Sequence, residues 1–180
     1  MGTGSAESGL VLPVPTATPV VSPWRERLDL SAVHGVPAHV TVLYPFVAPH
    51  ALDGTVVARL AALFATVEPF AFSLASVEWF GDDVVYLAPT PREPFVALTR
   101  AAMAQFPGHE PYAGAFDEIV PHLTVGDRGS RAELQRAADA VAPHLPIAAH
   151  ATEVWLMVGE PDRGRWTVRS RFPLGGRATA

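Results

Sequence analysis

The sequence predicts a single domain of mixed α and β structure that contains two copies of one unit. Patterns typical of strand, helix, strand, turn and strand follow one another over residues 39–88, and the same order returns over 122–172. The string HVTV at 39–42 opens the first copy, and HLTV at 122–125 opens the second. With 180 residues, of which 49% are hydrophobic and 17% charged, the chain is long and apolar enough to bury one core.

In the first half, β-prone runs alternate with helical patterns. Asp53 is a typical N-cap residue, and the apolar side chains of Val56, Leu60 and Phe64 recur on one face of a helix. Runs that alternate apolar and polar residues indicate strands. In chain order we expect strand Leu10–Val14, a helical turn over Pro23–Leu30, strand His39–Tyr44, a helix from Asp53 to about Thr66, strand Phe70–Phe80, a turn at 81–83, strand Val84–Ala88 and a helix from about Glu93 to Gln105.

The second half follows a loop, because the segment Phe106–Gly114 holds two prolines and two glycines. The expected elements are strand Val120–Gly126, a helix capped by Ser130 and ending near Val141, strand Ile147–Val158, a turn over Glu160–Gly164 and strand Arg165–Phe172. The domain therefore spans residues 10–174. We expect a disordered tail over residues 1–9 and a frayed tail over residues 175–180.

The composition excludes several classes of protein. The chain has no cysteine, which excludes disulfide scaffolds, thiol nucleophiles and cysteine-bound metals, and all thirteen basic residues are arginine, which excludes Schiff-base chemistry at a lysine. A net charge of −5 argues against binding to duplex DNA. No apolar run is long enough to span a membrane, and the first residues lack the features of a secretory signal. We expect a cytoplasmic protein without membrane contact and, since nothing in the sequence points to an obligate partner, a monomer.

The two repeated motifs place the same polar residues on matching strands. Side chains alternate across a strand, so with the valines of the first motif in the core, His39 and Thr41 point together to the other side. His122 and Thr124 do the same in the second copy. If the two copies pack about a pseudo-twofold axis, the two pairs face each other across a cleft. A third His-x-Thr begins at His150, but it lies inside a different predicted strand, and we interpret it as accidental.

Two histidines across a cleft suit the chemistry of phosphodiesters. One imidazole removes a proton from the attacking oxygen and the other protonates the leaving oxygen, because histidine exists in either state near neutral pH. The hydroxyls of Thr41 and Thr124 can donate hydrogen bonds to the non-bridging phosphoryl oxygens. This chemistry requires no metal, and the remaining histidines show no metal-binding spacing.

At these residues the sequence resembles the two-histidine (2H) phosphoesterase superfamily, in particular its 2′-5′ RNA ligase and cyclic phosphodiesterase branch. The hallmark is a pair of His-x-Thr/Ser-apolar motifs at this separation, with His39 and His122 being 83 positions apart. The strings HVTVLYPF and IVPHLTVG are both similar to members of the bacterial branch, and the likeness extends over residues 10–174.

The resemblance implies an α+β fold that is bilobal and duplicated, with two antiparallel sheets flanking a central cleft and helices outside. It also implies opening of the 2′,3′-cyclic phosphates of nucleotides or of RNA 3′ ends, commonly to a 2′-phosphate, without metal or cofactor. Some relatives join RNA ends through a 2′-5′ linkage. Carried over to this chain, His39 and His122 are the catalytic acid/base pair in either order, and Thr41 and Thr124 hold the phosphate.

The sequence departs from the family at one position. Many relatives carry a basic residue five positions after the second motif histidine, where this chain has Asp127 followed by Arg128. Either the phosphate clamp has shifted to Arg128 or the substrate differs. Arg169 and Arg171 share a face of the last predicted strand, and either could supply the missing positive charge.

Aromatic residues near the motifs are further candidates for contacts with substrate. Tyr44 and Phe46 follow the first motif and could stack on a base, or they could simply be core or rim aromatics. Tyr112, in the loop before the second motif, could reach the cleft or be an ordinary loop residue. We expect Arg25, Arg27 and Arg100 to be solvated.

Three functions remain open from the sequence. The leading hypothesis is a cyclic phosphodiesterase that acts on small nucleotides or RNA ends. A nucleotide- or RNA-binding module with little catalysis is the alternative that the missing basic residue favours. A purely structural protein would require both repeated motifs to be coincidental.

Overall fold

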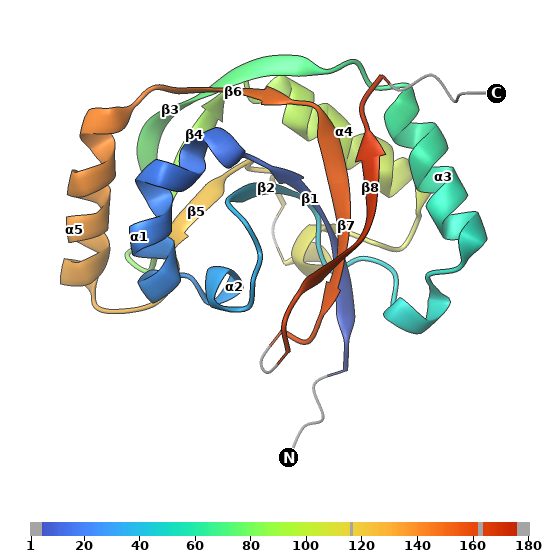
Figure 1. The fold of residues 1–180 in the computed structure, drawn as a ribbon, viewed down its shortest axis with the longest axis horizontal. Helices are drawn as coiled ribbons and strands as arrows, with labels where there is room; N and C mark the ends of the chain where they lie inside the picture. The colour runs from blue at the N-terminus through green and yellow to red at the C-terminus, as the bar shows by residue number, and fades with distance from the viewer. Residues whose placement is uncertain (1–4, 116, 162–163, 176–180) are drawn as a thin grey trace.

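The computed structural model describes residues 5–115, 117–161 and 164–175, with two four-stranded antiparallel sheets at the centre and helices outside them (Figure 1). This α+β arrangement confirms the predicted fold class. Of the predicted tails, residues 1–4 and 176–180 lie outside the described residues. Residues 7–9, which were predicted to belong to the N-terminal tail, instead begin the first strand.

The first sheet, sheet A, has the strand order β2-β1-β7-β8, and all its neighbouring strands are antiparallel. Strand β1 is buried over five consecutive residues because it lies between two strands and is covered on both faces. The strands of sheet A are β1 (Glu7–Pro13), β2 (His39–Leu43), β7 (Glu153–Gly159) and β8 (Thr167–Pro173).

The second sheet, sheet B, has the order β5-β4-β3-β6 and is also antiparallel. The β3–β4 hairpin turns at 81–83 as predicted, and Gly81 adopts the left-handed conformation that glycine tolerates, with φ 55°. The strands of sheet B are β3 (Phe70–Phe80), β4 (Val84–Thr90), β5 (Leu123–Gly126) and β6 (Ile147–Ala151).

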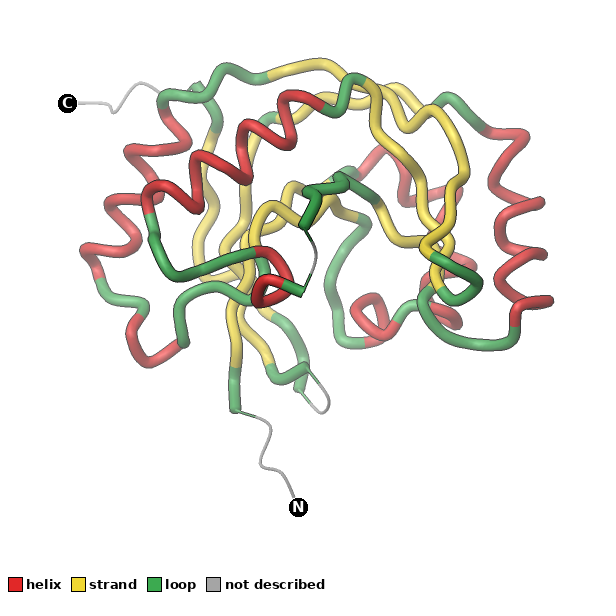
Figure 2. The backbone as a smooth tube through the Cα atoms, turned by 180° about the vertical axis from the view of Figure 1, so that it is seen from behind, coloured by secondary structure: helices red, strands yellow, loops and turns green. Residues whose placement is uncertain are grey.

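Helices α1, α3, α4 and α5 cover the outer faces of the two sheets (Figures 1 and 2). Helices α1 and α5 lie side by side at one end of the molecule, and α3 and α4 contact each other at the other. The predicted N-caps are confirmed, since the Asp53 carboxylate accepts from the Val56 amide and Ser130 forms a capping box with Glu133. The helices are α1 (Thr18–Leu28), α2 (Leu30–Val33), α3 (Gly54–Ala65), α4 (Glu93–Gln105) and α5 (Arg131–Val141).

The two halves of the chain exchange elements between the sheets. Sheet A combines β1 and β2 of the first half with the β7–β8 hairpin of the second, and sheet B combines β3 and β4 of the first half with β5 and β6 of the second. Helix α1 packs against β5 of sheet B, and α4 packs against β2 of sheet A. The repeats predicted over 39–88 and 122–172 end with β4 and β8. In sheet B, β4 lies between β5 and β3, whereas β8 is an edge strand of sheet A. The repeat is therefore not carried through to its last strand.

Two predicted elements differ most from the structure in their boundaries. The run predicted as one strand over 147–158 is two strands, because the chain leaves sheet B after Ala151 and enters sheet A at Glu153. Helix α1 begins at Thr18, five residues before the predicted helical turn, and contains Pro23 in its interior. The start of this helix could not be predicted from the sequence, because it contains prolines at 19 and 23 and proline usually interrupts a helix.

Between the sheets and helices lies a large hydrophobic core, and a smaller buried cluster of Val11, Val36 and Met157 lies apart from it. Trp155 and Trp166 pack against the smaller cluster. Over the described ranges, no helix combines the length and apolar character that crossing a bilayer requires.

Candidate active site

The two motif strands lie at the edges of the two sheets, next to each other. Strand β2 is an edge strand of sheet A, β5 is an edge strand of sheet B, and the two are in contact. Along β2 the side chains of Val40 and Val42 are buried while His39 and Thr41 are partly exposed. In β5, Thr124 is likewise partly exposed between two buried neighbours. The alternation predicted from the sequence is therefore present at both motifs.

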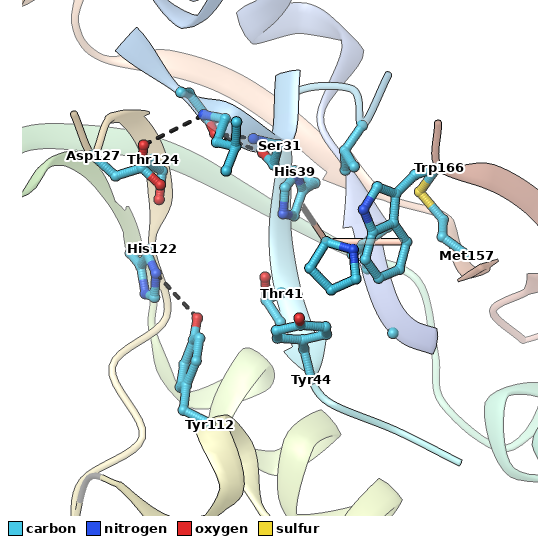
Figure 3. A pocket seen from close by; sticks show the side chains of 16 residues that line it. Ser31, His39, Thr41, Tyr44, Tyr112, His122, Thr124, Asp127, Met157 and Trp166 are labelled. Atoms are coloured by element: carbon cyan, nitrogen blue, oxygen red, sulfur yellow. Dashed lines mark hydrogen bonds between the residues drawn. The ribbon is translucent and has the colours of Figure 1, made fainter. Parts of the chain in front are cut away.

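A cavity of about 270 Å³ opens between these strands, and both motifs contribute to its wall (Figure 3). One part of the wall is polar, another is apolar and aromatic, and the histidines lie between them. The lining residues are Gly9, Val11, Asp29, Leu30, Ser31, Val36, His39, Thr41, Tyr44, Tyr112, His122, Thr124, Asp127, Met157, Pro161 and Trp166.

Both imidazole rings are anchored in the same way. Nδ1 of His39 lies 2.7 Å from the carbonyl oxygen of Pro37, and Nδ1 of His122 lies 2.7 Å from that of Val120. A carbonyl oxygen can only accept, so Nδ1 carries the proton in both rings. Nε2 of each ring is then the atom that can accept or deliver a proton in the cavity.

Burial keeps both histidines neutral at pH 7. Burial, together with the positive charge of Arg25, lowers the pKa of His39 to about 4, although the bond to Pro37 opposes the shift. Burial also lowers the pKa of His122, where the bond to the Val120 carbonyl again acts in the opposite direction. His39 thus lies near a buried cation, which makes it harder to protonate.

That cation belongs to a buried ion pair behind the cavity wall. Nε of Arg25 donates to Asp29 Oδ2 at 2.8 Å, and the guanidinium also reaches the Ser31 hydroxyl and the Val36 carbonyl. The prediction that Arg25 is solvated is wrong, because its side chain is only 4% exposed. The Asp29 carboxylate in turn accepts from the amide and the hydroxyl of Ser31. The ion pair therefore fixes the chain at the start of α2, where it forms one wall of the cavity.

Asp127 adds a second carboxylate to this wall. Its Oδ1 accepts a long hydrogen bond from the Leu30 amide, at 3.4 Å, which links the end of β5 to α2. Burial and the nearby charge of Asp29 raise the pKa of the Asp127 carboxyl. This chain therefore has the carboxylate of Asp127 in the cavity wall, at the position that was expected to carry a positive charge.

The structure brings most of the candidate residues together. His39, Thr41, Tyr44, Tyr112, His122 and Thr124 all line the cavity. The Tyr44 hydroxyl donates to Glu7, and its ring meets that of Trp166 edge-on at 5.9 Å between centroids. Tyr112 reaches in from the loop between α4 and β5, and its hydroxyl lies 3.3 Å from His122 Nε2.

Four candidates, one phenylalanine and three arginines, do not line the cavity. Phe46 is buried in the core and packs edge-on against Phe106 at 5.0 Å, so it is not available to stack on a base. Arg128 is exposed and does not line the cavity, although its amide donates to the Leu28 carbonyl. Arg169 and Arg171 lie on β8, and Arg171 stacks over Trp155 at 4.4 Å from the ring centroid.

Several lining residues escaped the reading of the sequence. For Asp29 the sequence does carry a signal, because it follows Arg25 by four residues, a spacing at which opposite charges pair on a helix. Ser31, Met157 and Trp166 carry no comparable signal, because they reach the cavity only through the tertiary fold. Within the described parts of the chain, no three acidic or histidine side chains gather in a way that could hold a metal ion.

Comparisons with known proteins give one matching family model and several solved structures of similar fold. A family model described as the 2′-5′ RNA ligase superfamily matches residues 12–163. Among solved structures, TT0787 of Thermus thermophilus is similar, with a TM-score of 0.67 and 19% identity over 95% of this chain and 99% of that one. E. coli LigT complexed with NADP+ gives 0.59 and 18% over 97% and 100%, and LigT complexed with 3′-AMP gives 0.57 and 18% over 94% and 98%. No curated protein sequence matches the chain.

Proposed function

The chain belongs to the 2′-5′ RNA ligase superfamily, and from this premise we propose that it opens 2′,3′-cyclic phosphates of nucleotides by acid/base catalysis at His39 and His122. Family and fold support a phosphoesterase or ligase kind of enzyme. One observation carries the finer proposal. Two imidazoles, each anchored through Nδ1, line one cavity, and each is followed two residues later by a threonine that lines the same cavity.

The reaction is a substitution at phosphorus. One neutral histidine takes a proton from water as the water oxygen bonds to phosphorus, and the bond from phosphorus to the ribose 3′ oxygen breaks. The other histidine, protonated at Nε2, gives its proton to that leaving oxygen, so the product is a 2′-phosphate. The hydroxyls of Thr41 and Thr124 donate to the non-bridging oxygens, where negative charge grows.

The charges around the two rings support an assignment of their roles. Arg25 lies near His39 and makes its protonation less favourable, whereas burial alone accounts for the lowered pKa of His122. The neutral form of His39 suits a general base. We therefore assign His39 as the base and His122 as the acid in the direction of hydrolysis.

The cavity wall favours a small substrate with one phosphate. None of the described residues that line the cavity is an arginine, and Asp29 and Asp127 contribute carboxylates. A polynucleotide brings a negative charge with every nucleotide, and this wall offers those charges no ion pair. The aromatic side, with Tyr44 and Trp166, offers rings against which a base can pack. The solved complexes of LigT with NADP+ and 3′-AMP support a nucleotide as the ligand.

Two further functions stay as second candidates. The family description favours joining of RNA ends through a 2′-5′ linkage, in which the same groups act while a ribose 5′ hydroxyl attacks phosphorus in place of water. The acidic wall, in place of a basic clamp, favours a module that binds nucleotides and turns them over slowly.

Incubation of the protein with a 2′,3′-cyclic mononucleotide and a chelator, followed by phosphorus NMR of the product, tests the proposal. A 2′-phosphate supports it. A bound but unchanged nucleotide favours the binding module, and a joined product with RNA ends favours the ligase.

A further inference from the structure

The hydroxyl of Tyr112 lies between the two motifs (Figure 3). It is 3.3 Å from His122 Nε2, in the motif of sheet B, and it forms a hydrogen bond with the Thr41 side chain, in the motif of sheet A. Since both groups are among those proposed to act on the cyclic phosphate, the tyrosine oxygen lies beside the phosphate position.

The cavity has few other donors for a phosphoryl oxygen. No arginine is found among its described lining residues. The Ser31 hydroxyl donates to Asp29 at 2.7 Å, and the Tyr44 hydroxyl donates to Glu7. Thr41, Thr124 and Tyr112 are the hydroxyls beside the histidines, and a phenol is more acidic than an aliphatic alcohol. Tyr112 is therefore suited to stabilise negative charge at this position.

The backbone that carries Tyr112 is held in a strained form. Tyr112 and Ala113 both adopt the left-handed backbone conformation, with φ 51° and 54°. For a residue other than glycine this conformation costs about 1–2 kcal/mol. The Tyr112 amide donates to the carbonyl of Tyr44 at 2.6 Å, which ties the loop to the end of β2. Such strain persists where the surrounding structure fixes it, often at functional sites.

We propose that Tyr112 is a further catalytic residue, whose hydroxyl donates a hydrogen bond to a non-bridging phosphoryl oxygen during opening of the cyclic phosphate, an inference that rests on the proposed function. When His122 is protonated at Nε2, the Tyr112 hydroxyl no longer donates to that nitrogen, and its hydrogen can point to the phosphoryl oxygen of the substrate. Burial raises the pKa of the Tyr112 hydroxyl, so it keeps its proton at neutral pH. Three neutral donors, from Thr41, Thr124 and Tyr112, then take the place of a basic clamp.

The test compares Tyr112→Phe with wild type in steady-state turnover of a 2′,3′-cyclic mononucleotide. The substitution keeps the ring and removes only the hydroxyl. We expect kcat to fall by about 10- to 100-fold, the range for one hydrogen bond to a charged group, with a smaller change in KM. The matched control is Tyr86→Phe, because that ring also packs against His122 while its hydroxyl donates to Glu78 at 3.1 Å. Its turnover should stay within about two-fold of wild type.

A binding measurement separates this inference from the proposed function. Calorimetry of inorganic phosphate with wild type and Tyr112→Phe needs no turnover, and the variant should bind phosphate at least about five-fold more weakly. If wild type opens no cyclic nucleotide but this difference is present, the proposed function fails and the anion-binding role of Tyr112 stands. Unchanged kcat and unchanged phosphate affinity, in a variant with the thermal midpoint of wild type, would overturn the inference. Faster turnover by the variant would also overturn it, since the hydroxyl would then block the site.

Discussion

His39 and His122 are anchored through Nδ1 to the carbonyl oxygen of the residue two positions earlier, at 2.7 Å in both cases. The matching bonds fix the same tautomer in both rings and leave Nε2 of each for proton transfer. The surroundings differ, however, because a buried arginine acts on His39 only. The same anchoring in unequal surroundings allows one ring to act as base and the other as acid.

The assigned roles predict different responses to the leaving group. In a phosphodiester of a nucleoside with p-nitrophenol, the leaving oxygen needs no proton. We expect His122→Ala to lose about 10²-fold or more in kcat with the cyclic substrate but about tenfold or less with the nitrophenyl diester. His39→Ala should lose activity similarly on both substrates. The opposite pattern would reverse the two roles.

The lowered pKa values of the histidines predict an acidic pH optimum. The reactive free enzyme carries one neutral and one protonated histidine, and both pKa values lie below the ordinary 6.5, that of His39 at about 4. As pH rises above the higher of the two, the acid loses its proton, so kcat/KM should fall about tenfold per pH unit at neutral pH. A pH series at constant ionic strength measures this, with circular dichroism as a check on folding. A plateau of kcat/KM from pH 6.5 to 8 would contradict it.

The buried pair of Arg25 and Asp29 should matter for stability. Asp29→Asn leaves a buried guanidinium without its counter-charge, so we expect the free energy of unfolding to drop by about 3–5 kcal/mol in urea titrations. The exposed pair of Arg92 and Glu118 provides the matched control. Glu118→Gln should change stability by less than about 1 kcal/mol. Equal effects of the two substitutions would show that the buried pair does not hold α2 in place.

The carboxylate of Asp127 should weaken anion binding. Replacing it in Asp127→Asn removes a negative charge from the cavity wall, and inorganic phosphate should bind about two- to five-fold more tightly, a gain below about 1 kcal/mol. Screening predicts that the gain shrinks as sodium chloride is raised from about 0.02 to about 0.5 M, which shortens the Debye length to about 4 Å. Asp139→Asn, on the exposed face of α5, is the control for a general change in net charge. Equal phosphate affinity in both variants would mean that Asp127 does not face the anion.

The motifs could be predicted from the sequence because their signal is local. The period of two along a strand places His39 with Thr41, and the repeated string identifies the matching pair. Phe46 lies beyond the end of β2, where the period of two no longer applies. Its side chain is buried in the core and does not line the cavity.

The rest depends on contacts between distant segments. The chain changes sheets at Thr152 without a glycine, a proline or a change in hydrophobic pattern to mark the break. Arg25 is buried because α1 packs against β5, α2 and α5, contacts that its own sequence does not reveal. Trp166 likewise reaches the cavity only because β8 pairs with β7.

Catalysis by two histidines is tested most directly by measuring turnover of the four 2′,3′-cyclic mononucleotides, with a chelator present, by wild type, His39→Ala, His122→Ala and His150→Ala. His150 begins the third His-x-Thr of the chain and is exposed on β6, so its variant is the matched control. The two-histidine mechanism predicts that wild type and His150→Ala open at least one substrate at equal rates, while each motif variant loses about 10²-fold or more. Full activity in either motif variant, or equal losses in all three, would contradict it.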